Sequence, residues 1–196
     1  MTERLLLSSF DTWQAHQPSN SSDDLLQLLA SERGFLRKAI FLRKLPVDFQ
    51  LAPEQTLVAL QSTQPRATIC CGMAEARSQL TVESQGTRGE SALHTLLDLP
   101  HLVQSLPFTE ISHDAGDFVC NHLYYEVLQY WRDRDPLHPC LFVHVPPLTP
   151  DNTAAILADF LAIVRYISQF ARSTASPSPT VAEAQRLRTY CDRAVS

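Results

Sequence analysis

Apolar residues in this chain follow two patterns, short runs and longer stretches with a helical period. Short apolar runs predict strands, and continuous ones predict strands covered on both faces of a sheet. The runs that we interpret as strands are residues 4–10, 35–47, 67–73, 78–86, 108–112 and 139–147. Apolar residues that recur every three or four positions predict helices, and these stretches span residues 23–34, 52–64, 120–131 and 151–171. Residues 87–106 show no clear period, and we expect one short helix there.

Strands that alternate with helices indicate an α/β fold with a mostly parallel sheet and helices on both faces. We expect one domain over residues 1–172, because no internal repeat interrupts the pattern. From residue 173 the composition changes. The segment "STASPSPT" predicts a Ser/Pro linker, and the residues after it predict a short helical tail up to residue 196.

Composition excludes several classes of protein. The 196 residues are 44% apolar, which is ordinary for a soluble domain, and we expect the longest apolar runs to be too short to cross a membrane. The N-terminus lacks the pattern of a signal peptide. The net charge of -5, without a basic run, argues against nucleic-acid binding. Five cysteines without a CxxC pair indicate free thiols in a reducing cytoplasm.

The stretch "HDAGDFVCNHLYYEVLQYW" places Cys120 where a turn leads into a helix. Gly116 suits a sharp turn, and Asp117 could cap the helix that follows. Unpaired N–H groups in the first helical turn favour a thiolate and could bind an oxyanion. However, Cys120 also begins the apolar stripe of the helix, so a packing role remains open.

His144 and Glu83 are candidates to act with this cysteine. His144 lies near the end of an apolar strand, and Glu83 lies within another one. An imidazole can take the proton of a thiol, and a carboxylate can orient the imidazole. The alternatives are a core histidine for His144 and a solvent-facing side chain for Glu83. In parallel sheets, sites lie at the carboxyl ends of strands, where Cys120 and His144 are both expected.

Other candidates are weaker. A metal site made of His138, Cys140 and His144 has a spacing that matches no zinc motif, so we expect no metal. Cys70 and Cys71 are adjacent in a strand and therefore point to opposite faces of the sheet, into the core. The chain has no Gly-rich phosphate loop, so no nucleotide cofactor is indicated.

Several segments, in order along the chain, resemble motifs of the pyroglutamyl peptidase I (pyrrolidone-carboxylate peptidase) family. The segment "SHDAGDFVCNHLYY" resembles its cysteine signature, S-x-x-A-G-x-[FY]-[VL]-C-N, and "LFVHVP" resembles its histidine motif, G-F-I-H-V-P. The segment "CGMAEARSQLTVES" is similar to G-L-A-x-G-R-x-x-[IL]-x-[IL]-E-R. Two matches are weaker. The segment "LLLSSFDTW" stands in place of the family's T-G-F-[DE]-P-F loop, and "LRKLPV" is similar to a family strand that ends in LPV.

The resemblance implies a three-layer α/β/α sandwich with a twisted, mostly parallel central sheet. It also implies a catalytic triad in which Cys120 is the nucleophile, His144 the general base and acid, and Glu83 the orienting carboxylate. Phe10 and Trp13 correspond to the aromatic residues that hold the substrate ring. The implied enzyme is a cysteine exopeptidase that removes an N-terminal pyroglutamyl residue through a thioester, without metal or cofactor. Its partner would be a peptide or small amide, and a homo-oligomer remains open.

Departures from the family motifs lie on the substrate side. Ser9 replaces a glycine, "QA" replaces Gly-Gly after Trp13, Ser84 replaces an arginine, and Thr87 replaces an asparagine. The stretch after Thr87 is also shorter. Two alternatives therefore stand beside pyroglutamyl hydrolysis. One is a thiol amidase or peptidase for a different small N-terminal acyl group, and the other is a non-catalytic binding protein with the same fold.

Overall fold

The computed structural model describes residues 4–31 and 39–174. The strands are β1 (Leu5–Phe10), β2 (Ala39–Leu45), β3 (Ala67–Met73), β4 (Leu80–Glu83), β5 (Gln85–Arg88), β6 (Ser91–His94), β7 (Thr109–Ser112) and β8 (Cys140–Val145). The helices are α1 (Ser21–Ser31), α2 (Leu51–Thr63), α3 (Leu99–Val103), α4 (Val119–Arg134) and α5 (Thr153–Thr174). Every helix and every sheet strand expected in the described segments is present, with ends that differ by a few residues.

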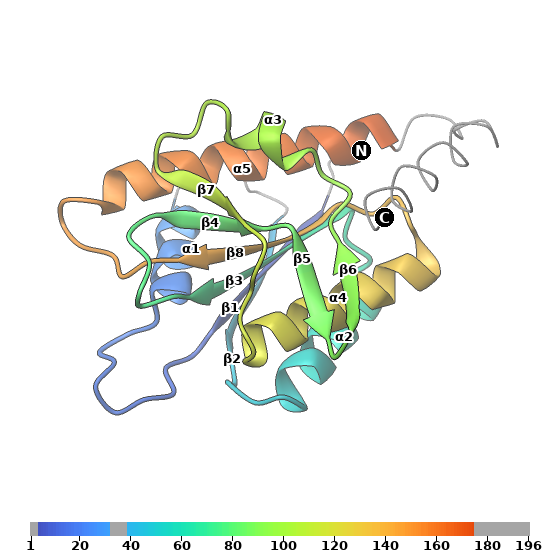
Figure 1. Cartoon of the computed structure of the whole chain (residues 1–196), viewed down its shortest axis with the longest axis horizontal. Coiled ribbons are helices and arrows are strands. Elements are labelled where there is room, and N and C mark those ends of the chain that lie inside the picture. The colour runs from blue at the N-terminus through green and yellow to red at the C-terminus, as the bar shows by residue number, and fades with distance from the viewer. Residues whose placement is uncertain (1–3, 32–38, 175–196) are drawn as a thin grey trace.

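Six strands form the central sheet, in the order β2-β1-β3-β8-β4-β7. All neighbouring strands are parallel except β4 and β8, which are antiparallel. Helices α1 and α5 pack on one face, and α2 and α4 pack on the other (Figure 1). The chain therefore has the predicted α/β/α layers and a mostly parallel sheet.

The two faces of the sheet belong to two separate apolar clusters, as continuous burial of the central strands predicts. Cys71 lies in the cluster under α1 and α5, whereas Cys70 lies in the cluster under α4. Both thiols are buried and free. The prediction that these two neighbours point to opposite faces is confirmed.

Helix α5 corrects one expectation from composition. Its 22 residues are long enough and apolar enough to cross a membrane, contrary to the expectation that the apolar runs are too short. In the fold, its apolar stripe packs on the sheet through residues such as Phe160, Ile163 and Ile167, all fully buried. The helix is apolar because it covers a central part of the sheet.

Residues 85–94 form a feature that the apolar pattern did not predict. Strands β5 and β6 make a two-stranded antiparallel hairpin. Gly89, the first residue of its two-residue turn, has a φ of 58°, and a tight hairpin turn with glycine in this position needs such a φ. The predicted short helix follows as α3. Ser173 and Thr174 extend α5, and the rest of the predicted linker and tail lies outside the described residues.

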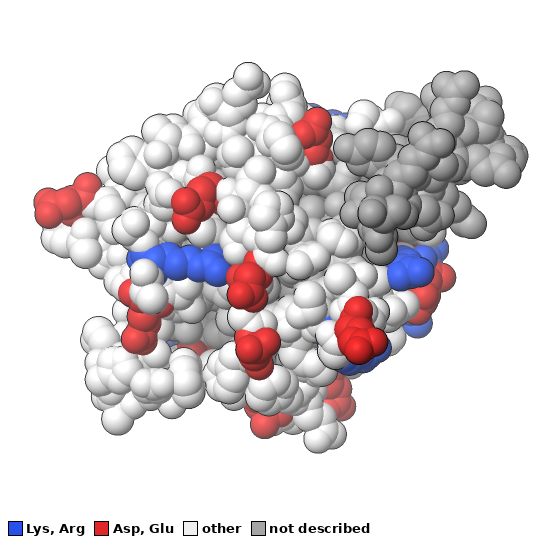
Figure 2. Space-filling view, viewed as in Figure 1, with Lys and Arg blue, Asp and Glu red and all other residues white. Residues whose placement is uncertain are grey.

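The face of the molecule in Figure 2 carries scattered acidic side chains and a few basic ones that stand apart from one another. This distribution agrees with the net charge of -5. On this face, the basic side chains therefore form no continuous patch.

Candidate active site

The helix that carries Cys120 begins one residue later than a cap at Asp117 would place it. The chain turns at Gly116, which has a φ of 79°, and α4 starts at Val119 with Phe118 in the N-cap position. The expectation that Asp117 caps this helix is wrong, because the cap residue is Phe118 and it has no side-chain acceptor. Cys120 is thus the second residue of the helix, where backbone N–H groups lack partners within the helix.

Cys120 reaches the centre of the sheet because β3 has a glycine there. A Cβ atom on Gly72 would lie 2.6 Å from Cys120 Sγ, so the sulfur fills the space that a side chain would need. Gly72 pairs with His144 across the parallel β3–β8 ladder. Paired residues of neighbouring strands lie about 4.8 Å apart and point to the same face. The sulfur of Cys120 therefore lies beside the strand position of His144, on the same side of the sheet.

Glu83 and His144 are in direct contact. The Nδ1 atom of His144 lies 2.7 Å from Glu83 Oε1, and both side chains are buried. With Nδ1–H donating to the carboxylate, Nε2 is left as an acceptor. Glu83 therefore does not face solvent, which was the alternative interpretation. No hydrogen bond joins Cys120 to His144 within the part of the chain that the structure describes.

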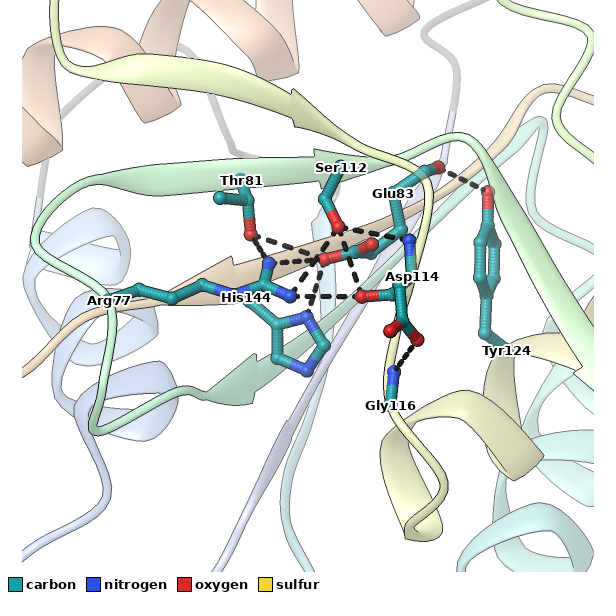
Figure 3. Close-up of polar contacts among 8 residues, drawn as sticks. All are labelled: Arg77, Thr81, Glu83, Ser112, Asp114, Gly116, Tyr124 and His144. Atoms are coloured by element: carbon teal, nitrogen blue, oxygen red, sulfur yellow. Dashed lines mark hydrogen bonds and ion pairs between the residues drawn. The ribbon is translucent and has the colours of Figure 1, made fainter.

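Arg77 is a further member of this cluster that the sequence reasoning missed. Its Nη1 atom donates to Glu83 Oε1 at 2.5 Å and also to Thr81, and its Nη2 atom donates to the Asp114 carbonyl at 3.0 Å (Figure 3). Arg77 thus connects the carboxylate to the turn that precedes α4. A usable signal existed, because a buried carboxylate needs a cationic or hydrogen-bonding partner.

Glu83 is held both at its backbone carbonyl and at one oxygen of its carboxylate, Oε1. The Tyr124 hydroxyl, one turn beyond Cys120 in α4, donates to the Glu83 backbone carbonyl at 3.1 Å (Figure 3). Burial raises the pKa of the Glu83 carboxyl, but the hydrogen bond and charge of His144, with the charge of Arg77, lower it by more. The net pKa lies below its ordinary value. Glu83 is therefore an anion that can orient an imidazole.

The thiol of Cys120 is less acidic than its position in the helix suggested. Burial, followed by the negative charge of Glu83 and the proximity of Cys70, raises its pKa to about 12, against a smaller lowering by Arg77. The expectation that the helix N-terminus favours a thiolate is therefore not met in this arrangement. Cys120 is a neutral thiol that must transfer its proton before it can attack.

The two aromatic residues expected at the substrate site have different surroundings. Phe10 is buried in the apolar cluster beneath α2 and α4, so it could form only the floor of a site. Trp13 is 51% exposed and its ring lies 4.9 Å from that of Phe118, two residues before Cys120. Phe49 packs edge-on against Phe118 at 5.5 Å. Phe49 and Phe118 were not singled out from the sequence, and their exposure is what identifies them.

His138 and Cys140 do not join this cluster. They lie at the start of β8, whereas His144 lies near its end. The His138 ring stacks on Trp131 at 3.5 Å and its Nε2 atom lies 3.0 Å from the Thr68 hydroxyl. Within residues 4–31 and 39–174, no group of three potential ligands is placed to hold a metal ion. The residues discussed as a metal site therefore have separate structural partners.

Comparison with known proteins gives consistent matches. A sequence profile described as Pyroglutamyl peptidase matches residues 87–159, which include Cys120 and His144. Pyrrolidone-carboxylate peptidase of Aliivibrio fischeri is 27% identical over 178 residues, covering 77% of this chain and 81% of that protein. The Streptococcus pyogenes protein of the same name is 26% identical over 188 residues, covering 80% of this chain and 86% of that protein.

Solved structures agree in fold over most of the chain. Pyroglutamyl peptidase I from Bacillus amyloliquefaciens superposes with a TM-score of 0.72 at 21% identity, covering 86% of this chain and 96% of that chain. Pyrrolidone carboxyl peptidase from Thermococcus litoralis superposes with a TM-score of 0.75 at 17% identity, covering 90% of this chain and 98% of that chain. The chain is therefore similar in sequence to the pyroglutamyl peptidase family, at low identity, and shares the fold of its solved structures.

Proposed function

We propose that this chain is a cysteine exopeptidase that hydrolyses the amide bond after an N-terminal pyroglutamyl residue. The observation that carries the proposal is the arrangement of three side chains around the inner strands β3, β8 and β4. Glu83 binds His144 Nδ1 at 2.7 Å. The Cys120 sulfur lies over Gly72, the ladder partner of His144. The Glu83–His144 contact leaves Nε2 as the acceptor that a thiol nucleophile requires.

The proposed reaction starts from the neutral thiol. As the Cys120 sulfur attacks the pyroglutamyl carbonyl carbon, its proton passes to His144 Nε2, and N–H groups in the first turn of α4 stabilise the oxyanion. The carbon–nitrogen bond then breaks, and His144 gives the proton to the leaving amine. Water, deprotonated by His144, attacks the thioester and releases pyroglutamate, and Cys120 takes back its proton.

The raised pKa of Cys120 fits this sequence of steps if the charge on His144 develops during attack. An imidazolium between Glu83 and Cys120 would offset the negative charge that raises the thiol pKa. The buried Glu83 carboxylate stabilises that imidazolium, as the orienting carboxylate does in other triads. We place the lactam ring of the substrate against the exposed surface that the contacting rings of Trp13 and Phe118 form together.

A non-catalytic binding protein is the second candidate, and one observation favours it. A thiol with a pKa of about 12 carries almost no thiolate at neutral pH. If no ligand promotes proton transfer to His144, Cys120 would remain inert. The fold and the aromatic surface would then serve binding alone.

A substrate panel separates these functions. We expect wild-type protein to release a fluorophore from a pyroglutamyl amide faster than from prolyl, acetyl or glutamyl amides, and Cys120→Ala to lose this activity. Preference for another acyl group, still dependent on Cys120, would indicate an amidase of different specificity. Equal background rates in wild type and Cys120→Ala, with both folded by circular dichroism, would contradict catalysis and support the binding function.

A further inference from the structure

The loop between β1 and α1 carries Trp13 and is exposed over most of its length. Its base is closed by backbone contacts. The Asp11 N–H donates to the Leu45 carbonyl at 2.8 Å, and the Asn20 side chain donates to the Asp11 carbonyl at 3.0 Å. These contacts fix where the loop leaves and rejoins the core, but they lie away from its tip.

Gln17 organises the tip of this loop. Its side-chain oxygen accepts the backbone N–H groups of Trp13 at 3.0 Å and Gln14 at 3.2 Å. Its side-chain nitrogen donates to Glu75 Oε1 at 2.6 Å, and His16 Nε2 lies 3.2 Å from both oxygens of Glu75. Gln17 is therefore bonded at one end to the backbone of Trp13 and at the other to the segment that follows β3.

The tip of the loop contacts Phe118 through Trp13, and its other residues border a cavity. This cavity, of about 370 Å³, lies beneath the tip, between the loop, the start of α1 and the ends of β3 and β8. Its lining includes Pro18, Met73, Pro147 and Leu148. Because this space separates the loop from the sheet, the polar contacts of Gln17 and His16 with Glu75 are what fix its position.

Glu75 suits this role. The hydrogen bonds from Gln17 and His16 lower the pKa of its carboxyl, which favours the anion. A hydrogen bond to an ionised acceptor is shorter and stronger than one between neutral groups. The 2.6 Å contact with Gln17 has that character.

We propose that Gln17 and Glu75 form a latch that holds Trp13 against Phe118, and that this latch determines how tightly the acyl group of the substrate is bound. Gln17 is thus a positioning residue that acts through Trp13. The inference rests on the proposed function, since it assumes that Trp13 contacts the substrate.

Exchanging the amide of Gln17 and the carboxylate of Glu75 tests the latch. Gln17→Glu keeps an acceptor for the Trp13 N–H but places a carboxylate against Glu75. We expect KM for a pyroglutamyl amide to rise about tenfold, the factor that corresponds to one lost hydrogen bond of this kind, with kcat little changed. Adding Glu75→Gln restores a donor and an acceptor, and we expect KM to return toward the wild-type value.

The matched control is Gln79→Glu, since Gln79 donates to Glu110 of the edge strand β7 at 2.8 Å, a bond of the same kind that involves neither Gln17 nor Glu75. It should leave KM unchanged. Iodide quenching of tryptophan fluorescence gives a second readout, because Trp13 is exposed and Trp131 is only 9% exposed. We expect stronger quenching in Gln17→Glu and recovery in the double variant.

Unchanged quenching in Gln17→Glu, or a double variant that recovers neither quenching nor KM, would overturn the latch. If wild type does not turn over pyroglutamyl amides, the proposed function fails separately. In that case the quenching series still decides whether the latch exists.

Discussion

At the scale of single residues, the site depends on a glycine as much as on its charged groups. Gly72 leaves the space in which the Cys120 sulfur lies, and any Cβ there would also come within 3.0 Å of the Phe142 ring. Glycine is therefore required at this position for lack of volume rather than for backbone freedom. The nucleophile, the base position and the glycine meet because β3 and β8 are neighbours in register.

Arg77 offers a test of the electrostatics. Its positive charge lowers the pKa of both Glu83 and Cys120, so Arg77→Gln should raise both pKa values. We expect slower labelling of Cys120 by iodoacetamide at a pH of about 9, near the ordinary thiol pKa. We also expect kcat to fall by roughly tenfold or more, since about 1.4 kcal/mol of lost orientation corresponds to that factor.

Arg77→Lys is the informative comparison for this prediction. Lysine keeps the charge but cannot bond Glu83 and the Asp114 carbonyl together with one planar group. Labelling should therefore recover while kcat recovers only in part. Labelling at the wild-type rate in Arg77→Gln would show that the charge of Arg77 does not reach the thiol.

Cys120 and His144 could be identified from the sequence because each lies beside a signal formed by neighbouring residues. One follows a turn signal, and the other ends an apolar strand. The contact of Glu83 with His144 could not be read from local patterns, because it depends on the antiparallel pairing of β4 with β8. The ion pair of Arg77 with Glu83 and the contact of the Trp13 ring with the Phe118 ring likewise depend on where separate loops meet.

At the scale of elements, the hairpin β5–β6 braces the helix that carries the nucleophile. The side chain of Asn121, next to Cys120, accepts the Thr87 N–H at 2.7 Å and donates to the Thr87 carbonyl at 2.9 Å. Gly86 lies so close to α4 that a Cβ atom would be 2.7 Å from the Tyr125 backbone nitrogen. The hairpin thus supports α4, a role that a search for helical periods could not predict.

Two glycine substitutions in this hairpin separate close packing from backbone strain. Gly89 has open space around it but a φ of 58°, so Gly89→Ala should cost about 1 kcal/mol of stability. Gly86→Ala pushes against helix backbone that cannot move aside, and we expect a larger loss of about 2 to 3 kcal/mol. Urea denaturation of both variants checks this order. An equal or smaller loss for Gly86→Ala would mean that β5 does not need its close approach to α4.

At the scale of the whole molecule, acid should lower the stability of the protein through His138, which lies at the end of the sheet opposite the site. Burial of His138 lowers its pKa from 6.5 to about 3. The folded state therefore binds fewer protons than the unfolded state between these values, and stability falls as the pH drops below 6.5. The lowered carboxyl pKa values of Glu83 and Asp23 act in the same direction but at lower pH.

His138→Gln tests this source of acid sensitivity. We expect wild type to lose about 2 to 3 kcal/mol between a pH of roughly 6.5 and roughly 4.5, given about 1.4 kcal/mol per pH unit for one group. The variant should be less stable at neutral pH, because it loses the stacking on Trp131, but its stability should change less over that interval. Denaturation curves at several pH values give the slopes, and parallel slopes would assign the acid sensitivity to other groups.

The family fold extends over most of this chain although identity is low, 17% to the Thermococcus litoralis structure. The departures from the family motifs that the sequence indicates lie in the loop that carries Trp13 and in the segment after Glu83. The central claim is that these differences still leave a cysteine site that accepts a pyroglutamyl group.

The most direct test is affinity labelling with a pyroglutamyl chloromethyl ketone, in which the Cys120 sulfur displaces chloride and forms a carbon–sulfur bond. We expect one adduct per chain, located at Cys120 by peptide mass spectrometry. We also expect labelling about tenfold or more faster than by the cyclopentane analogue, which lacks the lactam, since its hydrogen bonds would be lost. Equal rates with the two reagents, or an adduct at another cysteine, would contradict the account.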